Sequence, residues 1–171
     1  MTKHTLMPPG PNAAEFGGLG PAARMVLTTD GTVTPMLEQL VGERIVTARL
    51  RHDEPATGAG PAAATSRTGP DLPLVRTTEL VGARSGTVYI RARTVLAPDA
   101  LPQPLRTDLT TTDEPIGRLL RKHRVESFRE LVSCSVAGDG SAHRRYRVYI
   151  GGVVALSIEE SFSPACFTGA G

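Results

Sequence analysis

Two charged residues, Arg76 and Glu160, occupy positions that should face the apolar side of β-strands. Each lies at two-residue spacing from apolar neighbours, the spacing at which strand side chains share a face. These neighbours are Leu74 and Leu80 for Arg76, and Leu156, Ile158 and Phe162 for Glu160. A charge on a buried face is costly unless it is paired or used, so both residues are candidates for chemistry. For Arg76 an alternative remains open, in which its stem covers apolar surface while its head reaches water.

The chemistry open to these side chains is the binding of a small carboxylate ligand. An arginine fork holds a carboxylate through two parallel hydrogen bonds, and a glutamate can bind a hydroxyl group or assist proton transfer. Two segments that should begin helices, 33–36 and 115–117, add backbone N–H groups and the positive end of a helix dipole. Together these features predict a pocket for a small anion that has more than one carboxylate and a hydroxyl group.

The two helix starts are predicted from their proline and capping residues. Thr34 is a suitable N-cap, and Pro35 fits the first position of the helix that follows. A second helix should begin near Pro115, with Thr112 or Asp113 as its cap.

Alternating apolar and polar residues predict the strands of a sheet. They fall at 44–52, 74–81, 87–96 and 125–136, and on both sides of Gly151-Gly152. Glycine supplies the positive φ that a two-residue hairpin turn requires. Neighbouring strands have hairpin-like connections without helical crossovers, so the sheet should be antiparallel. We therefore predict an α+β fold with a single antiparallel β-sheet of about six strands and helices packed on it.

The chain should form one catalytic domain, 21–165, between less regular ends. Residues 1–20 are rich in Pro and Gly and are predicted to be a flexible N-terminal arm, and 166–171 a short tail. Residues 53–73 are rich in Ala, Gly, Pro and Thr without periodicity. A loop of this length inside a domain is typically disordered or functional, so we predict a flexible loop that is a possible lid.

Composition narrows the class of protein. The 171 residues have a net charge of +2 and include 40% hydrophobic residues, which does not indicate a nucleic-acid partner. No apolar run is long enough for a membrane span and no secretory pattern is visible, so we expect a cytoplasmic protein. The basic segments 118–129 and 143–147 are interpreted as solvated faces. No cofactor or metal signature is found, so we expect neither, and the oligomeric state stays open.

Several short phrases resemble those of the chorismate pyruvate-lyase family, in particular its actinobacterial branch that makes 4-hydroxybenzoate. The matching phrases occur in the family's order between about 27 and 163: Asp30-Gly31-Thr32-Val33-Thr34, Arg76, Ala92-Arg93-Thr94-Val95-Leu96-Ala97-Pro98, Thr112-Asp113-Glu114-Pro115-Ile116-Gly117, Glu126-Ser127-Phe128, Tyr146-Arg147-Val148, Gly151-Gly152 and Glu160-Ser161-Phe162. Ile116 replaces the family's usual leucine, and segment 53–73 has no convincing counterpart.

The resemblance implies a lyase that converts chorismate to 4-hydroxybenzoate and pyruvate without a cofactor. Arg76 matches the arginine that clamps a carboxylate, and Glu160 the glutamate that hydrogen-bonds the ring 4-oxygen. Val33 and Ile116 match positions whose backbone N–H groups hold the ligand. Thr34 and Gly117 continue the same helix starts and complete the predicted substrate-binding set. Glu159, on the other strand face, is expected to be dispensable.

Two alternatives to this lyase remain open. The first is a related enzyme of secondary metabolism that acts on a different small carboxylate. The second is a non-catalytic module that binds an aromatic acid, because this kind of sheet is similar to the ligand-sensing domains of bacterial transcription regulators. Release of pyruvate from chorismate distinguishes the lyase from both.

Overall fold

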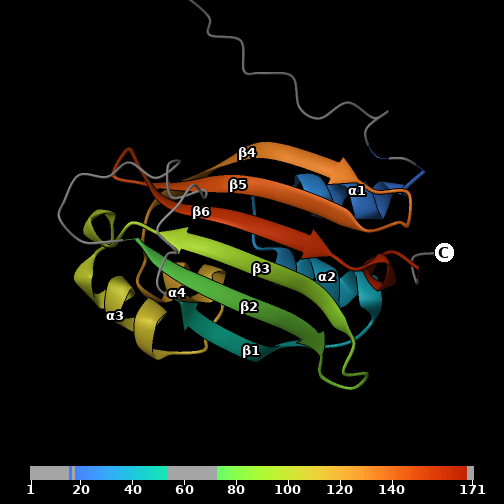
Figure 1. Cartoon of the computed structure of the whole chain (residues 1–171), viewed down its shortest axis with the longest axis horizontal. Helices are drawn as coiled ribbons and strands as arrows, with labels where there is room; N and C mark the ends of the chain where they lie inside the picture. The colour runs from blue at the N-terminus through green and yellow to red at the C-terminus, as the bar shows by residue number, and fades with distance from the viewer. Residues whose placement is uncertain (1–15, 17, 54–72, 169–171) are drawn as a thin grey trace, which may run out of the picture.

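A six-stranded antiparallel sheet forms the centre of the computed structural model, which describes residues 16, 18–53 and 73–168. The strands are β1 (Ile45–Asp53), β2 (Leu74–Gly82), β3 (Val88–Leu96), β4 (Ser127–Val136), β5 (Ala142–Ile150) and β6 (Val153–Phe162). Their order across the sheet is β1-β2-β3-β6-β5-β4 (Figure 1), and every neighbouring pair is antiparallel. The predicted fold class is therefore confirmed.

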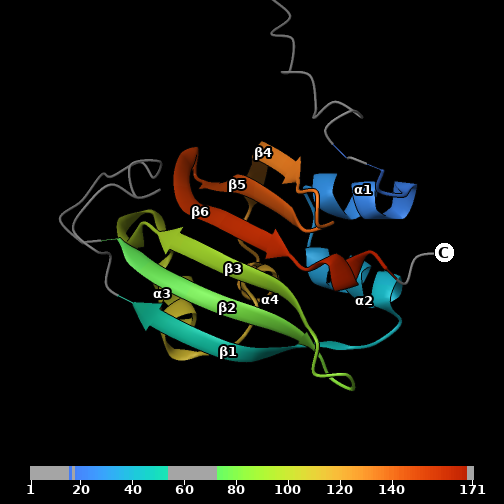
Figure 2. The same cartoon turned by 45° about the vertical axis from the view of Figure 1, so that its right-hand side comes forward.

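Four α-helices lie behind the sheet in the view of Figure 1. They are α1 (Pro21–Thr28), α2 (Val33–Val41), α3 (Gln103–Thr111) and α4 (Ile116–Lys122), with short 3-10 turns η3 (Pro98–Ala100) and η4 (Pro164–Cys166). The pair α1 and α2 lies toward one end of the sheet and the pair α3 and α4 toward the other, as the turned view also shows (Figure 2). Within the described ranges, no helix has both the length and the apolar character needed to cross a membrane.

The start of α2 differs from the prediction. The N-cap is Thr32 rather than Thr34, so Pro35 is the third helical residue rather than the first. The missing N–H of proline has no cost there, because the first-turn N–H groups have no partner within the helix. At its other end α2 stops at Gly42, whose φ of 69° is the left-handed conformation that glycine adopts readily.

The start of α4 also differs from the prediction. Pro115 itself is the N-cap, whereas Thr112 ends the preceding helix α3 and donates its backbone N–H to the carbonyl oxygen of Asp108. Neither Thr112 nor Asp113 therefore caps α4. The residue before a proline is disfavoured in the α conformation, which explains why the helix begins after Pro115 and not before it.

The interior is divided into two apolar clusters. The first, here the α1/α2 core, consists of Phe16, Val26, Leu27, Val33, Leu37, Ile45, Leu80, Tyr89, Ile90, Ala142, Phe162 and Cys166. The second, the α3/α4 core, consists of Leu96, Leu101, Leu105, Leu109, Leu119, Leu120, Val148, Ala155, Leu156 and Ile158. Between them the middle of the sheet carries polar side chains, so the division of the core leaves a place for a site.

The predicted arm, loop and tail fall largely outside the described ranges. Positions 1–15, 17, 54–72 and 169–171 are among the residues that the structure does not describe. Of the described residues near the ends, Phe16 and Cys166 are buried in the α1/α2 core.

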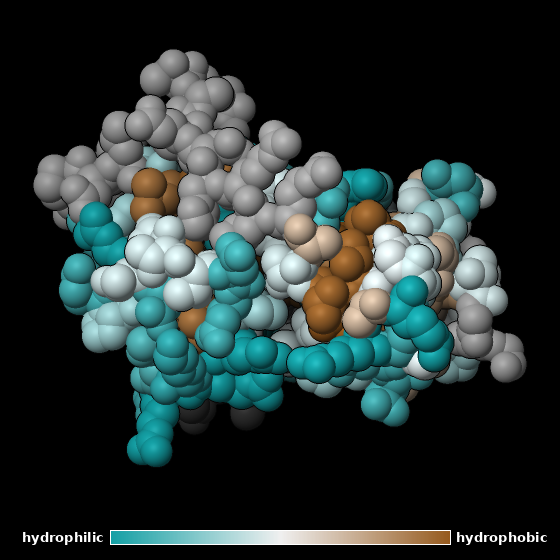
Figure 3. Space-filling model, turned by 90° about the horizontal axis from the view of Figure 1, so that it is seen from below, coloured by the Kyte–Doolittle hydropathy of each residue, from teal (hydrophilic) through white to brown (hydrophobic). Residues whose placement is uncertain are grey.

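Seen from below, the drawn surface is mainly hydrophilic and is interrupted by a compact apolar patch (Figure 3).

Candidate active site

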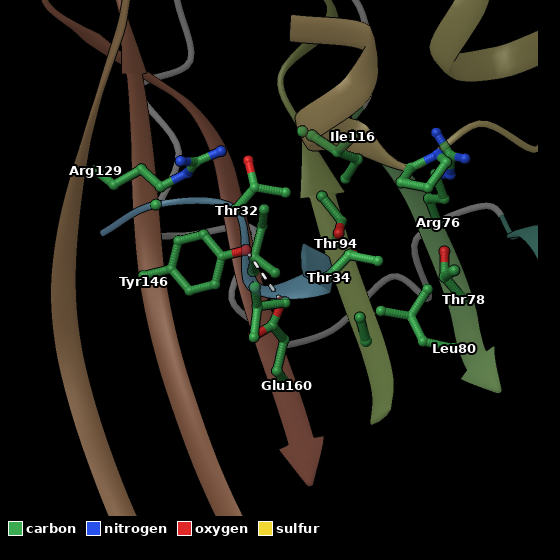
Figure 4. A pocket seen from close by; sticks show the side chains of 16 residues that line it. Thr32, Thr34, Arg76, Thr78, Leu80, Thr94, Ile116, Arg129, Tyr146 and Glu160 are labelled. Atoms are coloured by element: carbon green, nitrogen blue, oxygen red, sulfur yellow. Dashed lines mark hydrogen bonds between the residues drawn. The ribbon is translucent and has the colours of Figure 1, made fainter. Parts of the chain in front are cut away.

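A pocket lies between the middle of the sheet and the N-terminal ends of α2 and α4 (Figure 4). All six residues predicted to form the site line it: Val33, Thr34, Arg76, Ile116, Gly117 and Glu160. Further lining residues come from β2, β3, β4, β5 and β6 and include Thr78, Thr94, Arg129 and Tyr146. The structure thus brings together charged residues from strands and backbone from two helix starts.

Strand alternation explains why the pocket lies between the two cores. On β2, Leu74 packs against the α3/α4 core and Leu80 belongs to the α1/α2 core. Arg76 and Thr78, which lie between them at two-residue spacing, face the pocket. The sheet therefore presents core residues at both ends of the strand and pocket residues in its middle.

Arg76 is a buried cation whose hydrogen bonds all go to backbone carbonyls. Its side chain is 1% exposed, and its two Nη groups donate to the carbonyl oxygens of Leu109, Thr112 and Glu114 at 3.5, 3.4 and 2.6 Å. Burial lowers the pKa of Arg76, and the nearby Asp113 carboxylate partly opposes that shift. Within the described part of the chain no carboxylate forms an ion pair with it.

The head of Arg76 does not reach water, so the alternative of an edge arginine is wrong. Its Nε atom is buried and has no hydrogen-bond partner among the described residues. A buried donor without a partner costs about 1–3 kcal/mol. Such a group in a pocket wall is suited to a ligand that brings an acceptor oxygen, and a carboxylate does so with the correct charge.

Glu160 is also buried, and both of its oxygens already accept a hydrogen bond. Its Oε2 atom accepts from Nε of Arg144 at 2.5 Å, and Oε1 accepts from the hydroxyl of Tyr146 at 3.2 Å. Glu160 is 6% exposed and Arg144 3% exposed. The pair is therefore a desolvated ion pair with a tyrosine at its pocket side (Figure 4).

Arg144 is held in place from several directions. Its Nη1 atom donates to the carbonyl oxygens of Val26, Leu27 and Thr29 at the end of α1, at 3.0, 3.4 and 3.3 Å. The guanidinium also lies over the rings of Tyr146 and Phe162, 5.0 and 5.4 Å from their centroids, an arrangement that favours a cation. These contacts fix Arg144, which in turn fixes the carboxylate of Glu160.

The pKa values of this cluster follow from burial and from the ion pair. Burial lowers the pKa of Arg144, but the charge and hydrogen bond of Glu160, together with Tyr146 and Cys134, outweigh burial, so the pKa is raised. Burial, with the Glu160 charge beside it, raises the pKa of Tyr146. Tyr146 is therefore a neutral hydrogen-bond donor near physiological pH, which suits its contact with Glu160.

The sequence interpretation missed Arg144 and Tyr146, because 143–147 was predicted to be solvated. A regular two-residue hairpin at Gly151-Gly152 places Arg144 opposite Glu159. In the structure the register shifts between Val148 and Tyr149, so that Val148 pairs with Leu156 and Arg144 pairs with Glu160. This β-bulge moves Arg144 onto the face of Glu160. The signal present in the sequence was the two-residue spacing that places Arg144 and Tyr146 on the same strand face as Ala142 and Val148.

The two helix starts approach each other closely at Gly117. A Cβ atom added there would lie 2.9 Å from Cγ2 and 3.0 Å from Oγ1 of Thr32, the N-cap of α2. Only a residue without a side chain fits such a distance without a shift of its neighbour. Gly117 therefore keeps both helix starts at the wall of the pocket.

Gly117→Ala should displace the two helix starts slightly. For the reaction that the resemblance implies, pyruvate release from chorismate, we expect kcat/KM to fall by about tenfold, because a small displacement of a positioned group can weaken catalysis strongly. The matched control is Gly138→Ala, where an added Cβ meets nothing within 4 Å. Adding Thr32→Ala to Gly117→Ala removes the clashing atoms and should restore part of the activity. Equal activity of Gly117→Ala and Gly138→Ala would contradict a role for this contact.

The described part of the chain contains no cluster of three or more His, Cys, Asp or Glu side chains that could hold a metal ion. The polar groups at the pocket are instead arginines, threonines, one tyrosine and one carboxylate. These groups bind and orient a ligand and position hydrogen bonds around it. The fold and this site define a small-ligand pocket on an α+β sheet.

Comparison with known proteins gives the family. A family model described as "chorismate pyruvate-lyase Rv2949c-like" matches residues 27–143, most of the chain. The protein belongs to this family, and the resemblance seen in the sequence is confirmed. The matched range includes Val33, Arg76, Ile116 and Arg129, whereas Glu160 lies beyond it.

Individual relatives agree with the family. A protein of Mycobacterium leprae (strain TN) named chorismate pyruvate-lyase is 27% identical over 188 residues, covering 98% of this chain and 83% of that protein. One of Mycobacterium tuberculosis (strain ATCC 25618 / H37Rv) with the same name is 24% identical over 161 residues, covering 84% and 80%. Among solved structures, the C-terminal domain of a histidine utilization repressor from Pseudomonas syringae has a TM-score of 0.44 at 12% identity. It covers 69% of this chain and 89% of that one, and no functional inference follows from it.

Proposed function

We propose that this protein converts chorismate to 4-hydroxybenzoate and pyruvate without a cofactor. One observation carries the proposal: Arg76, in the wall of the pocket, is a buried cation. Among the described residues its Nε has no hydrogen-bond partner and its charge has no carboxylate partner. Family membership and the names of the mycobacterial relatives support chorismate as the substrate.

Arg76 is assigned to a substrate carboxylate. Nε and one Nη of a guanidinium form a fork that matches the two oxygens of a carboxylate. The carbonyls of Leu109, Thr112 and Glu114 keep the Nη groups oriented, so the fork is preorganised before substrate binds. The N–H groups of Val33, Thr34, Ile116 and Gly117 are proposed as further donors at the pocket wall.

Glu160 is assigned to the hydroxyl group at C4 of the ring. Arg144 and Tyr146 each donate to one of its oxygens, and a carboxylate oxygen can accept more than one hydrogen bond. A hydroxyl at C4 can donate to it and is thereby held in one orientation. Glu160 then positions the ring so that the ether at C3 and the hydrogen at C4 have the geometry for elimination.

The reaction balances without any other reactant. The C3–O bond breaks, the enolpyruvyl group leaves and becomes pyruvate, and its methylene carbon gains a hydrogen. The ring loses its C4 hydrogen and becomes aromatic, so the atoms of chorismate are divided completely between the two products. Because aromatisation drives the reaction, the protein needs to position and desolvate the substrate rather than supply a strong nucleophile.

Pyruvate release from chorismate, followed in a coupled assay, tests this proposal. Glu160→Gln should lower kcat/KM by at least about tenfold, a loss of roughly 1.4 kcal/mol or more, because the amide has nearly the same shape but no charge. The matched control is Glu159→Gln, since Glu159 lies on the opposite face of β6 and pairs in register with Arg93 and Arg145. We expect this control to retain wild-type activity.

Pyruvate release at the wild-type rate by the Glu160→Gln variant would contradict the role assigned to Glu160. If the wild-type protein releases pyruvate from isochorismate or a related acid but not from chorismate, a changed substrate replaces the proposal. Tight binding of an aromatic acid without any pyruvate release indicates a binding module. Identification of 4-hydroxybenzoate by chromatography completes the test of the product.

A further inference from the structure

We infer that Arg129 forms a second carboxylate-binding position, which makes the pocket selective for substrates with two carboxylates. The inference rests on the proposed function and extends it to the group that leaves. Arg129 is a half-buried residue of β4 that lines the pocket. Residues 118–129 were predicted to form a solvated face, so this role was not expected from the sequence.

Arg129 lies across the pocket from Arg76. Across the sheet the pocket residues follow the order Arg129 on β4, Tyr146 on β5, Glu160 on β6, Thr94 on β3 and Arg76 on β2. Adjacent strands are about 4.8 Å apart, so β4 and β2 are separated by about 19 Å. The Arg76 guanidinium lies at the α3–α4 connection, where it donates to the carbonyls of Leu109, Thr112 and Glu114. Figure 4 shows the guanidinium of Arg129 beside Thr32, directed toward the interior of the pocket.

The guanidinium of Arg129 is anchored but not neutralised. Its Nη1 atom donates to the carbonyl oxygen of Asp30 at 2.8 Å, which fixes the fork next to the start of α2. Within the described part of the chain no carboxylate forms an ion pair with Arg129. Two of the three groups on the fork therefore remain available to a ligand.

The charge of the pocket supports the same inference. Among its described lining residues the charged ones are Arg76, Arg129 and Glu160. The charge of Glu160 is already compensated by the buried Arg144 behind it. Two positive charges thus remain, one on each side of the carboxylate, and they match a dianion. Chorismate has one carboxylate on the ring and one on the enolpyruvyl group, whereas 4-hydroxybenzoate has one.

With Arg76 holding the ring carboxylate, Arg129 is placed to hold the enolpyruvyl carboxylate. The bond that breaks lies between these two anchors, so the substrate is held at both ends while the product that keeps the ring is held at one. After cleavage pyruvate remains at Arg129 and 4-hydroxybenzoate at Arg76. Replacing Arg129 should therefore weaken the binding of chorismate only, whereas replacing Arg76 should weaken the binding of both chorismate and 4-hydroxybenzoate.

The test compares Arg129→Met, Arg129→Lys and Arg76→Met, with exposed Arg121→Met as a control for loss of one positive charge. KM for chorismate and competitive inhibition by 4-hydroxybenzoate are measured for each. Arg129→Met should raise KM at least tenfold while the inhibition constant changes less than threefold. Arg129→Lys should raise KM less than Arg129→Met does. Arg76→Met should weaken the binding of both chorismate and 4-hydroxybenzoate, and Arg121→Met should weaken the binding of neither. Thermal unfolding confirms that each variant is folded.

An unchanged KM in Arg129→Met, or an equal weakening of both ligands, overturns the inference. A second measurement does not depend on turnover: calorimetric titration of chorismate and 4-hydroxybenzoate into Glu160→Gln and into Glu160→Gln/Arg129→Met. The quantity compared is the affinity for chorismate relative to that for 4-hydroxybenzoate. A lower ratio in the double variant than in Glu160→Gln supports the Arg129 position, even if the wild-type protein releases no pyruvate. Absence of pyruvate release would overturn the proposed reaction alone. An undiminished preference in the double variant overturns the Arg129 position alone.

Discussion

Arg144→Met is expected to lower the free energy of unfolding by about 3–5 kcal/mol, the usual cost of removing one partner from a buried ion pair. The substitution leaves the Glu160 carboxylate, 6% exposed, without its cation. It also removes the donor to the last carbonyls of α1 at Val26, Leu27 and Thr29. Activity should fall with stability, since Arg144 orients the carboxylate that faces the pocket.

Urea denaturation at neutral pH measures this loss, and two further variants define its cause. Arg145→Met, which changes the neighbouring exposed arginine on the other face of β5, should change stability by less than about 0.5 kcal/mol. Adding Glu160→Gln to Arg144→Met removes the uncompensated charge and should recover part of the loss. Additive effects of the two substitutions would show that the pair is not coupled.

Arg76→Met is expected to lower kcat/KM by at least about a hundredfold, because two charge-assisted hydrogen bonds to a carboxylate are lost at about 1.5–3 kcal/mol each. Arg76→Lys keeps the charge but not the fork, so its loss should be smaller, about tenfold. Unlike Arg144, Arg76 has no carboxylate partner within the described residues. Replacing it therefore leaves no unpaired charge, although the carbonyls of Leu109, Thr112 and Glu114 lose their donor. The free energy of unfolding should fall by less than in Arg144→Met.

The contrast between activity and stability is the critical readout for Arg76. The assay is initial-rate pyruvate release, with the midpoint of thermal unfolding measured for the same preparations. Arg91→Met is the matched control, because Arg91 lies on the outer face of β3 with its side chain 66% exposed and pairs with Glu79 there. A large drop in the unfolding midpoint with unchanged kinetics would assign Arg76 to structure instead of substrate binding.

Local pattern was sufficient to predict the strands and several residues that line the pocket. Alternation placed Arg76 and Glu160 on inward faces because side-chain direction in a strand is set by position alone. Proline marked the two helix starts, although it did not define the first residue of either. Family resemblance, rather than pattern, supplied the roles assigned to Val33 and Ile116.

Partners across the sheet were beyond local pattern. Arg144 meets Glu160 through a register shift in the β5–β6 hairpin, and a bulge changes which residues are opposite without any distinct residue signal. The contacts of Arg76 with Leu109 and Glu114 join residues 33 and 38 positions apart. Arg129 was interpreted as solvated because it ends a basic segment, 118–129, and the start of α2 could not be placed against it from sequence.

The division of the interior into two cores has a consequence for which residues can be changed without loss of packing. Pocket positions such as Thr78 and Thr94 are bracketed on their own strands by residues of both cores, for example Ile90 and Leu96 on β3. Substitutions in the middle of a strand can therefore alter the ligand while the apolar packing that sustains the sheet stays intact. At these positions, ligand contact and apolar packing are therefore carried by different residues of the same strand.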